Sequence, residues 1–567
     1  MTSRARRLTT LATALLAALG IAPNLAPGLA AEDLSRLSLH LVAEHHEKIE
    51  PLEIEVARRF WDANVCGTQE AFRLKQEAES RLDVALSDRE WFARLKRCDA
   101  APLADKLLAR QVRLLYLQSL PKQVDRELLG QLVARANGIE MRFNTYRPRV
   151  GDEQFTANEV RRLLRESTDS ERRRAVWESS KAVGAELRDE LLALVRLRNQ
   201  AARQLGVADY YEMQLLTNEQ TPRQVLRLFD ELDELTRGPF MAAKREIDAR
   251  LAVQCGVSVD ELRPWHYHDP FFRDAPLVDL KGLDAIYARV DVVESCRKFY
   301  AGIGLGVDDV LQRSDLFEKP KKHPSAFCLD IDRAGDVRVL ANVEPGEFAM
   351  STMLHELGHA VYSSKNMPAE LPYLLRCESH ILTTEGVAML FEQFSKNARW
   401  LHQMDVEVDD HAALDEAVHA VRRHKLLIFA RFSQVVQRFE RELYRDPDQD
   451  LNRLWWDLVE KYQGLTRPEG RDAPDYASQL HIVTAPAYFH NYMLGELFAC
   501  QLRDAIARDA LGGVDPRNAC YVGRAEVGRF FRERVFEPGR RLDWNELTKF
   551  ATGEELGVDA FAGGLAH

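Results

Sequence analysis

The sequence feature that most constrains this 567-residue chain is the run His355-Glu356-Leu357-Gly358-His359, an HExxH motif. Apolar residues recur around it at helical spacing, which predicts a helix over residues 347–363. Histidines at positions i and i+4 lie one turn apart on the same helix face, so both imidazoles can bind one Zn²⁺. Glu356 lies beside them and is the candidate general base. A catalytic zinc usually takes a third protein ligand, so the fold has to bring one from another element.

The next predicted helix, over residues 377–394, supplies two candidates for that third ligand. Glu385 leads into an apolar run and is expected to point inward, so we predict that it completes a site for one Zn²⁺ per chain. Glu378 lies seven residues earlier, on nearly the same face of the predicted helix. We expect it to be a neighbour of the metal rather than a ligand, and the alternative is a solvated charge on the helix surface.

A later segment carries side chains that could stabilise the oxyanion formed in peptide hydrolysis. His481, Tyr488 and Tyr492 fall within it, and we assign His481 and Tyr492 catalytic roles and Tyr488 a substrate-binding role. Tyr488 and Tyr492 are spaced i and i+4, so we expect them to share a helix face. The same spacing is equally typical of a pair of core aromatic residues.

Two short apolar segments, 327–331 and 337–340, flank a turn of sequence Asp-Arg-Ala-Gly-Asp and predict a β-hairpin just before the HExxH helix. A strand edge beside a metal site can hold a peptide substrate extended through backbone hydrogen bonds. The alternative is a hairpin with a purely structural role.

Helical periodicity dominates the rest of the chain, so we predict a mainly α fold. The predicted helices cover residues 50–64, 68–87, 103–119, 125–143, 157–206 with a break near Asp169, and 221–255. Thr156 and Glu159 are spaced as a capping box at the start of one of them. We predict one helical unit over residues 32–567, divided into an N-terminal lobe (32–300) and a zinc-site lobe (301–567).

The first 31 residues have the pattern of a signal peptide. Three arginines are followed by a short apolar run over residues 11–22 and by a region of small residues, with cleavage expected after Ala30 or Ala31. We therefore expect a periplasmic or secreted protein with no membrane span after signal removal, since no later segment is long and apolar enough. The net charge of -11 argues against a nucleic-acid partner. Export makes disulfides possible among the eight cysteines, and the pair that we favour is Cys66 with Cys98.

Taken together, these motifs resemble those of the angiotensin-converting-enzyme (peptidyl-dipeptidase A) family of zinc metallopeptidases, here as a bacterial exported member. Asp336-Val337-Arg338 begins nineteen residues before His355, where the family has a similar triplet. Residues 323–327, His-Pro-Ser-Ala-Phe, resemble the family strand that pairs with the substrate backbone. Glu385 matches the family's glutamate ligand, and His481 matches a histidine that contacts bound peptide.

The resemblance implies a two-lobed helical fold with a deep central channel and a small hairpin beside the HExxH helix. It implies oligopeptide substrates from which C-terminal dipeptides are released. It also implies that His323, Ser325 and Ala326 bind the substrate, in the strand beside its backbone.

The chain departs from the family pattern at several positions. Thr384 stands where the family has a histidine, Gln479 where it has a lysine that binds the substrate's terminal carboxylate, and His490 where it has a chloride-binding arginine. Two alternatives therefore stay open: a zinc endo-oligopeptidase of the thimet type, and a catalytically inactive peptide-binding protein. The presence of both histidines, Glu356 and a third carboxylate argues against the inactive protein.

Overall fold

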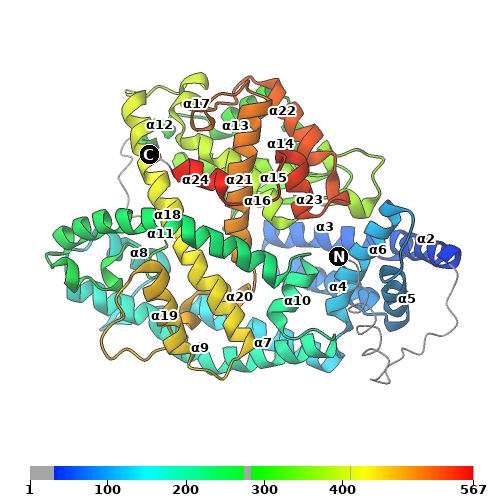
Figure 1. Ribbon diagram of the computed structural model, residues 1–567, viewed down its shortest axis with the longest axis horizontal. Helices are drawn as coiled ribbons and strands as arrows, with labels where there is room; N and C mark the ends of the chain where they lie inside the picture. Colours follow the sequence, from blue (N-terminus) through cyan, green and yellow to red (C-terminus); the bar gives the residue numbers. More distant parts are fainter. Residues whose placement is uncertain (1–30, 274–282, 409, 566–567) are drawn as a thin grey trace, which may run out of the picture.

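The computed structural model describes residues 31–273, 283–408 and 410–565 (Figure 1). Almost all of its regular structure is helical, with two short antiparallel hairpins, which confirms the predicted mainly α fold. The predicted signal segment lies outside the described residues except at its last position. In the described part of the chain, no helix is long and apolar enough to cross a membrane.

The helices and strands follow one another in three stretches. The first contains α2 (Ala31–Lys48), α3 (Glu50–Cys66), α4 (Gln69–Leu86), α5 (Arg89–Asp99), α6 (Lys106–Ser119) and α7 (Arg126–Thr145). The second contains β1 (Arg149–Val150), β2 (Glu153–Gln154), α8 (Ala157–Glu166), α9 (Ser170–Gln204), α10 (Tyr210–Thr217), α11 (Pro222–Cys255), α12 (Leu283–Tyr287), α13 (Val292–Gly302) and α14 (Asp308–Arg313). The third contains β3 (Phe327–Asp330), β4 (Val337–Leu340), α15 (Glu347–Val361), α16 (Ile381–Glu392), α17 (Ala398–Gln403), α18 (His411–Arg445), α19 (Leu451–Gln463), α20 (Leu480–Thr484), α21 (His490–Asp509), α22 (Ala525–Phe531), α23 (Trp544–Thr552) and α24 (Asp559–Leu565).

Local capping explains where several helices begin. Thr156 and Glu159 form the predicted capping box of α8, in which each side chain hydrogen-bonds the other residue's backbone N–H. The predicted break near Asp169 is confirmed, since α8 ends before it and Asp169 caps α9. Helix α5 was not predicted, although Asp88 caps it by accepting hydrogen bonds from two backbone N–H groups.

Helices from both halves of the chain share one large hydrophobic core. Helix α18 crosses α11 (Figure 1), and the buried Arg431 of α18 donates hydrogen bonds to Asp233 of α11 and to the carbonyl of Tyr462. Because α11 precedes residue 300 and α18 follows it, packing is continuous across the predicted lobe boundary. That boundary stays a prediction.

All eight cysteines are free, so the predicted bridge between Cys66 and Cys98 is wrong. Cys98 is buried in α5 within a small apolar cluster that includes Leu41 and Leu95, whereas Cys66 is exposed at the end of α3. The periodicity of α5 turns its cysteine into this cluster and away from the surface.

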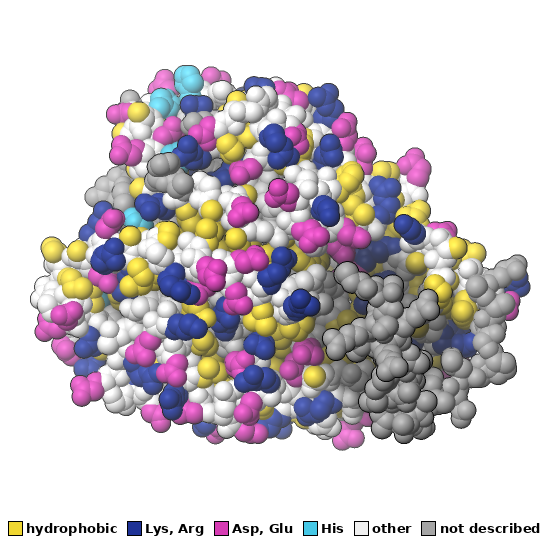
Figure 2. Space-filling model, viewed as in Figure 1, with side chains coloured by type: hydrophobic (Ala, Val, Ile, Leu, Met, Phe, Trp, Pro, Cys, Tyr) yellow, Lys and Arg dark blue, Asp and Glu magenta, His cyan; other side chains and the backbone are white. Residues whose placement is uncertain are grey.

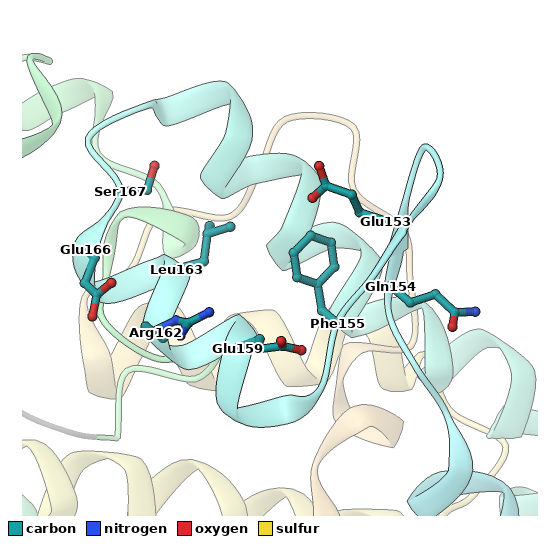
Figure 3. Close-up of a pocket in the computed structure, with 8 residues that line it drawn as sticks. All are labelled: Glu153, Gln154, Phe155, Glu159, Arg162, Leu163, Glu166 and Ser167. Atoms are coloured by element: carbon teal, nitrogen blue, oxygen red, sulfur yellow. The ribbon is translucent and has the colours of Figure 1, made fainter.

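The described surface is mixed in charge. On the face shown in Figure 2, acidic and basic side chains are interspersed over the part that is not covered by grey atoms. An open cavity of about 530 Å³ lies between β2 and α8, where Phe155 and Leu163 are flanked by Glu153, Glu159 and Arg162 (Figure 3). None of the residues that line this cavity belongs to the HExxH region.

Candidate metal centre and active site

Three helices cross closely at the HExxH motif because glycines lie at their contacts. A Cβ atom at Gly358 of α15 would lie 2.8 Å from the Cα atom of Ala388 on α16. A Cβ atom at Gly386 of α16 would lie 2.7 Å from the carbonyl oxygen of Gly495 on α21. No side chain fits at either point, so glycine permits the approach despite its cost of about 1 kcal/mol within a helix.

The crossing brings the three predicted metal ligands together. The Nε2 atoms of His355 and His359 are 3.1 Å apart, and Nε2 of His355 is 3.6 Å from Oε2 of Glu385. One ligand atom from each residue lies within 4.8 Å of the other two. Among the described residues, this is the one group of three or more histidine, cysteine and acidic side chains placed to hold a metal ion.

Each imidazole is also held at its other nitrogen. Nδ1 of His355 lies 2.8 Å from Oε2 of Glu392, and Nδ1 of His359 lies 2.7 Å from the hydroxyl oxygen of Thr384. These contacts fix the ring orientations and leave both Nε2 atoms facing the same point, as in metal-binding histidines generally. Glu392 was not predicted as a site residue, although it follows Glu385 by two turns of α16, and Thr384 was predicted only as a departure from the family pattern.

The electrostatics of the group fit a bound cation. Burial by itself lowers the pKa of His355, but the hydrogen bond to Glu392 and the charges of nearby carboxylates raise it to about 9. Burial and the charge of His355 lower the pKa of His359 to about 3. The carboxylates therefore favour a positive charge between the rings, and two imidazole nitrogens with one carboxylate oxygen form a donor set typical of catalytic zinc.

Glu356 lies beside this group and under the hairpin. Its side chain is 8% exposed, and burial, with a contribution from the charge of Glu385, raises its pKa to about 7. The backbone of Cys328 in β3 hydrogen-bonds to its carboxylate, which places the predicted hairpin next to the metal group. A carboxylate with a pKa near neutrality suits proton transfer.

The helix predicted over residues 377–394 is shorter than expected. It begins at Ile381 because the side chain of His380 caps it, accepting a hydrogen bond from the N–H of Leu382. Glu378 therefore precedes α16, and the prediction that it shares a helix face with Glu385 is wrong. It lies near β3 instead, where its charge adds to burial in raising the pKa values of Cys328 and Asp330.

The three residues predicted to stabilise the oxyanion, His481, Tyr488 and Tyr492, lie close together but do not share one helix face. Helix α21 begins at His490, so Tyr488 lies in the preceding turn and the predicted shared face with Tyr492 is wrong. The two tyrosine rings are nevertheless 5.3 Å apart, and the ring of His481, on α20, lies 5.8 Å from that of Tyr492. Burial and, to a lesser degree, the charge of Glu385 raise the pKa values of both tyrosines, so their hydroxyls stay protonated at neutral pH.

A buried carboxyl on α18 holds the turn that carries Tyr488. Ala487 has a φ of 54°, a left-handed conformation that is uncommon for a residue other than glycine. Its N–H donates a hydrogen bond of 2.8 Å to Oε1 of Glu440, which is 1% exposed. Burial raises the pKa of Glu440 to about 8. Nothing in the local sequence indicated this contact, because it joins residues 47 positions apart.

The predicted substrate-binding residues His323, Ser325 and Ala326 lie just before β3, which begins only at Phe327. The strand predicted from the resemblance is therefore shorter, because the chain bends here. The N–H of Ser325 donates to Nδ1 of His323, and the side chain of Asn342 donates to the carbonyl of His323. The hydrogen bond from the hairpin to Glu356 is made by the backbone of Cys328, and the role of His323, Ser325 and Ala326 stays a prediction.

Comparisons with known proteins agree with this geometry. The sequence model of the family described as angiotensin-converting enzyme matches residues 35–237 and 275–562. Angiotensin-converting enzyme from Oryctolagus cuniculus is 22% identical over 299 residues, which cover 49% of this chain and 22% of that protein. Carboxypeptidase 1 from Bacillus subtilis is 26% identical over 264 residues, 42% of this chain and 50% of that protein.

The pig enzyme, angiotensin-converting enzyme from Sus scrofa, is 21% identical over 398 residues, 64% of this chain and 29% of that protein. The chain thus matches half or less of the length of each of these relatives. The family match, in contrast, covers most of the chain and includes every residue of the metal group. The protein therefore belongs to the angiotensin-converting enzyme family.

Proposed function

We propose that this protein is a zinc-dependent peptidase that releases dipeptides from the C-termini of short peptides. The observation that carries the proposal is the group of His355, His359 and Glu385 with Glu356 buried beside it. Family membership supports peptide hydrolysis, and the Bacillus relative named a carboxypeptidase supports action at a C-terminus.

His355, His359 and Glu385 would hold the zinc. When bound, zinc polarises the scissile carbonyl and lowers the pKa of water, which supplies the nucleophile at neutral pH. Glu356 accepts a proton from the attacking water and returns it to the leaving nitrogen. Glu392 and Thr384 keep the two imidazoles oriented throughout.

The hydroxyls of Tyr488 and Tyr492 are candidate hydrogen-bond donors, since the charge of Glu385 acts on both. They keep their protons at neutral pH because their pKa values are raised, so Tyr492 can donate a hydrogen bond to the carbonyl oxygen as it becomes negative. His481 is neutral at pH 7, since burial lowers its pKa to about 4, and it serves as a neutral hydrogen-bonding partner for the peptide. The segment of His323, Ser325 and Ala326 would lie along the substrate backbone.

One observation favours endopeptidase action as a second candidate. Gln479 is 1% exposed and neutral, so the position that resembles the family's carboxylate-binding lysine carries no charge here. An enzyme without a fixed cation for the terminal carboxylate would cleave blocked and free peptides equally.

The experiment combines metal analysis with peptide hydrolysis. We expect about one zinc per chain, and we expect mass spectrometry of a digested octapeptide to show successive C-terminal dipeptides. Glu356→Gln should keep its zinc and lose kcat by about 10²–10⁴-fold, because the proton acceptor is lost and the ligands remain. Internal cleavage of an amidated peptide at the same rate would favour the endopeptidase, and zinc binding without hydrolysis would favour the inactive peptide-binding protein.

We also propose that the protein is exported to the periplasm or secreted. The support is the pattern of residues 1–31 in the sequence. Cell fractionation with N-terminal sequencing of the mature protein tests this, and an N-terminus that retains residue 1 or 2 in the cytoplasmic fraction would refute it.

A further inference from the structure

A cavity of about 350 Å³ is lined by residues of α15, α16, α18 and α21. Ser351 lies one turn before His355 on α15, and Met389 lies one turn after Glu385 on α16, and both line it. Tyr492 of α21 and Glu392, the hydrogen-bond partner of His355, also line it. Residues spaced by four share a helix face, so the cavity is the next turn of the same surfaces that carry the metal group.

Most of the charged side chains in this cavity already have partners. Lys396 pairs with Glu347, Arg422 with Glu496, Arg503 with Asp504 and Arg517 with Asp515. Glu392 pairs with His355. Asp415 accepts a hydrogen bond from the N–H of Ala398.

Lys425 of α18 differs from these cations. In the described part of the chain, its side chain is exposed, and its ammonium group makes no hydrogen bond and has no acidic group within ion-pair distance. Burial raises the pKa of Glu392, but the hydrogen bond to His355 and the charges of His355, Lys425 and Lys396 lower it overall. The ammonium group is therefore close enough to act electrostatically on a carboxylate that contacts a metal ligand.

We propose that Lys425 is the cation that receives a carboxylate of the bound substrate, in the cavity on the Tyr492 side of the metal centre. The proposal rests on the proposed peptidase function and deepens it by naming the charged group of the substrate. A peptide offers this chemistry at its C-terminus or in an acidic side chain. The open cavity has room for the part of a peptide that carries such a group. Lys425 supplies a positive charge that has no ion-pair partner among the described residues.

The test measures binding separately from turnover. It uses zinc-loaded Glu356→Gln protein and three fluorescent peptides of one sequence: the free acid, the C-terminal amide, and an amide with glutamate as its last residue. Adding Lys425→Gln should raise the Kd of the free acid about fivefold, the size expected for a partly exposed ion pair, and leave the neutral amide unchanged. Added salt should weaken binding of the free acid to the parent protein and have little effect in the variant.

The matched control is Arg423→Gln, which removes a positive charge two residues away on the same helix from a side chain that does not line the cavity. It should leave all three affinities unchanged. If Lys425→Gln weakens binding of the free acid alone, the ligand of Lys425 is the C-terminal carboxylate. If it weakens binding of the glutamate peptide alone, the ligand is an acidic side chain. Equal effects on the acid and the amide, or no effect on either charged peptide, would overturn the proposal, since Lys425 would then act only on Glu392 or not at all.

Hydrolysis by the protein with an intact Glu356 separates this result from the fate of the proposed function. If the parent protein cleaves no peptide but Lys425→Gln still weakens binding of a carboxylate, the peptidase proposal fails and the carboxylate site stands. If cleavage occurs and Lys425→Gln leaves KM unchanged both for free-acid peptides and for peptides with a glutamate side chain, the peptidase stands and the carboxylate site fails.

Discussion

Because the carboxyl group of Glu440 is buried, we predict that the stability of the folded protein depends on pH through this group. A single substitution of Glu440 tests the prediction. Burial raises its pKa from 4.5 to about 8 in the folded protein. Because the folded state holds this proton more tightly than the unfolded state, the contribution of Glu440 to the free energy of unfolding is complete below about pH 4.5. It is lost as the pH rises through 8. A pKa difference is worth about 1.4 kcal/mol per pH unit, so the loss between pH 5 and 8 is about 3–4 kcal/mol.

Replacing Glu440 with glutamine removes this titration and keeps the contact, since an amide oxygen can still accept the hydrogen bond from Ala487. Thermal unfolding of the parent and Glu440→Gln proteins would be compared at pH 5, 6, 7 and 8. We expect similar Tm values at pH 5 and a variant that becomes progressively more stable than the parent, by a few degrees at pH 8.

Glu442→Gln is the matched control. It removes a carboxylate from the same helix, but from a partly exposed side chain that pairs with Arg445. Its difference in Tm from the parent should not grow in the stabilising direction with pH. A difference between Glu440→Gln and the parent that stays constant from pH 5 to 8 would refute the reasoning, because Glu440 would then be ionised throughout.

Three further predictions concern the metal centre. Thr384→Val removes the hydroxyl that holds His359 and should lower zinc affinity about tenfold in a chelator competition, whereas Thr384→Ser should retain it; equal affinities would show that the contact is dispensable. Glu385→Ala should lose zinc in metal analysis while Glu378→Ala retains it, and the opposite result would exchange the two assignments. Tyr492→Phe should lower kcat more than it raises KM in steady-state assays, and a change in KM alone would make Tyr492 a substrate-binding residue.

The sequence was informative where local rules determine the structure. The HExxH helix, the hairpin before it and the capping box at Thr156 depend on residue periodicity and on side chains three or four positions apart. Helix α5 followed the same rules and was still missed, although Asp88 is a typical capping residue.

The errors arose where distant segments decide the structure. Helix α16 starts late because a histidine caps it, a residue type with little statistical preference for that position, and this displaced Glu378 from the predicted face. The partners of the two metal-site imidazoles, Glu392 and Thr384, became visible only when α15 and α16 were placed side by side. The support of the Tyr488 turn by Glu440 likewise depends on α18 lying next to residues far along the chain.

The glycine contacts among α15, α16 and α21 separate the positioning of the hydrolytic residues from the binding of the substrate. Backbone approach at Gly358 and Gly386 sets how closely the helix axes cross, and hence the positions of the hydrolytic side chains. Ser351 and Met389, one turn beyond the metal ligands on α15 and α16, line the neighbouring cavity instead. A protein built in this way can acquire a new preference among peptides during evolution without rebuilding the chemistry that cuts them.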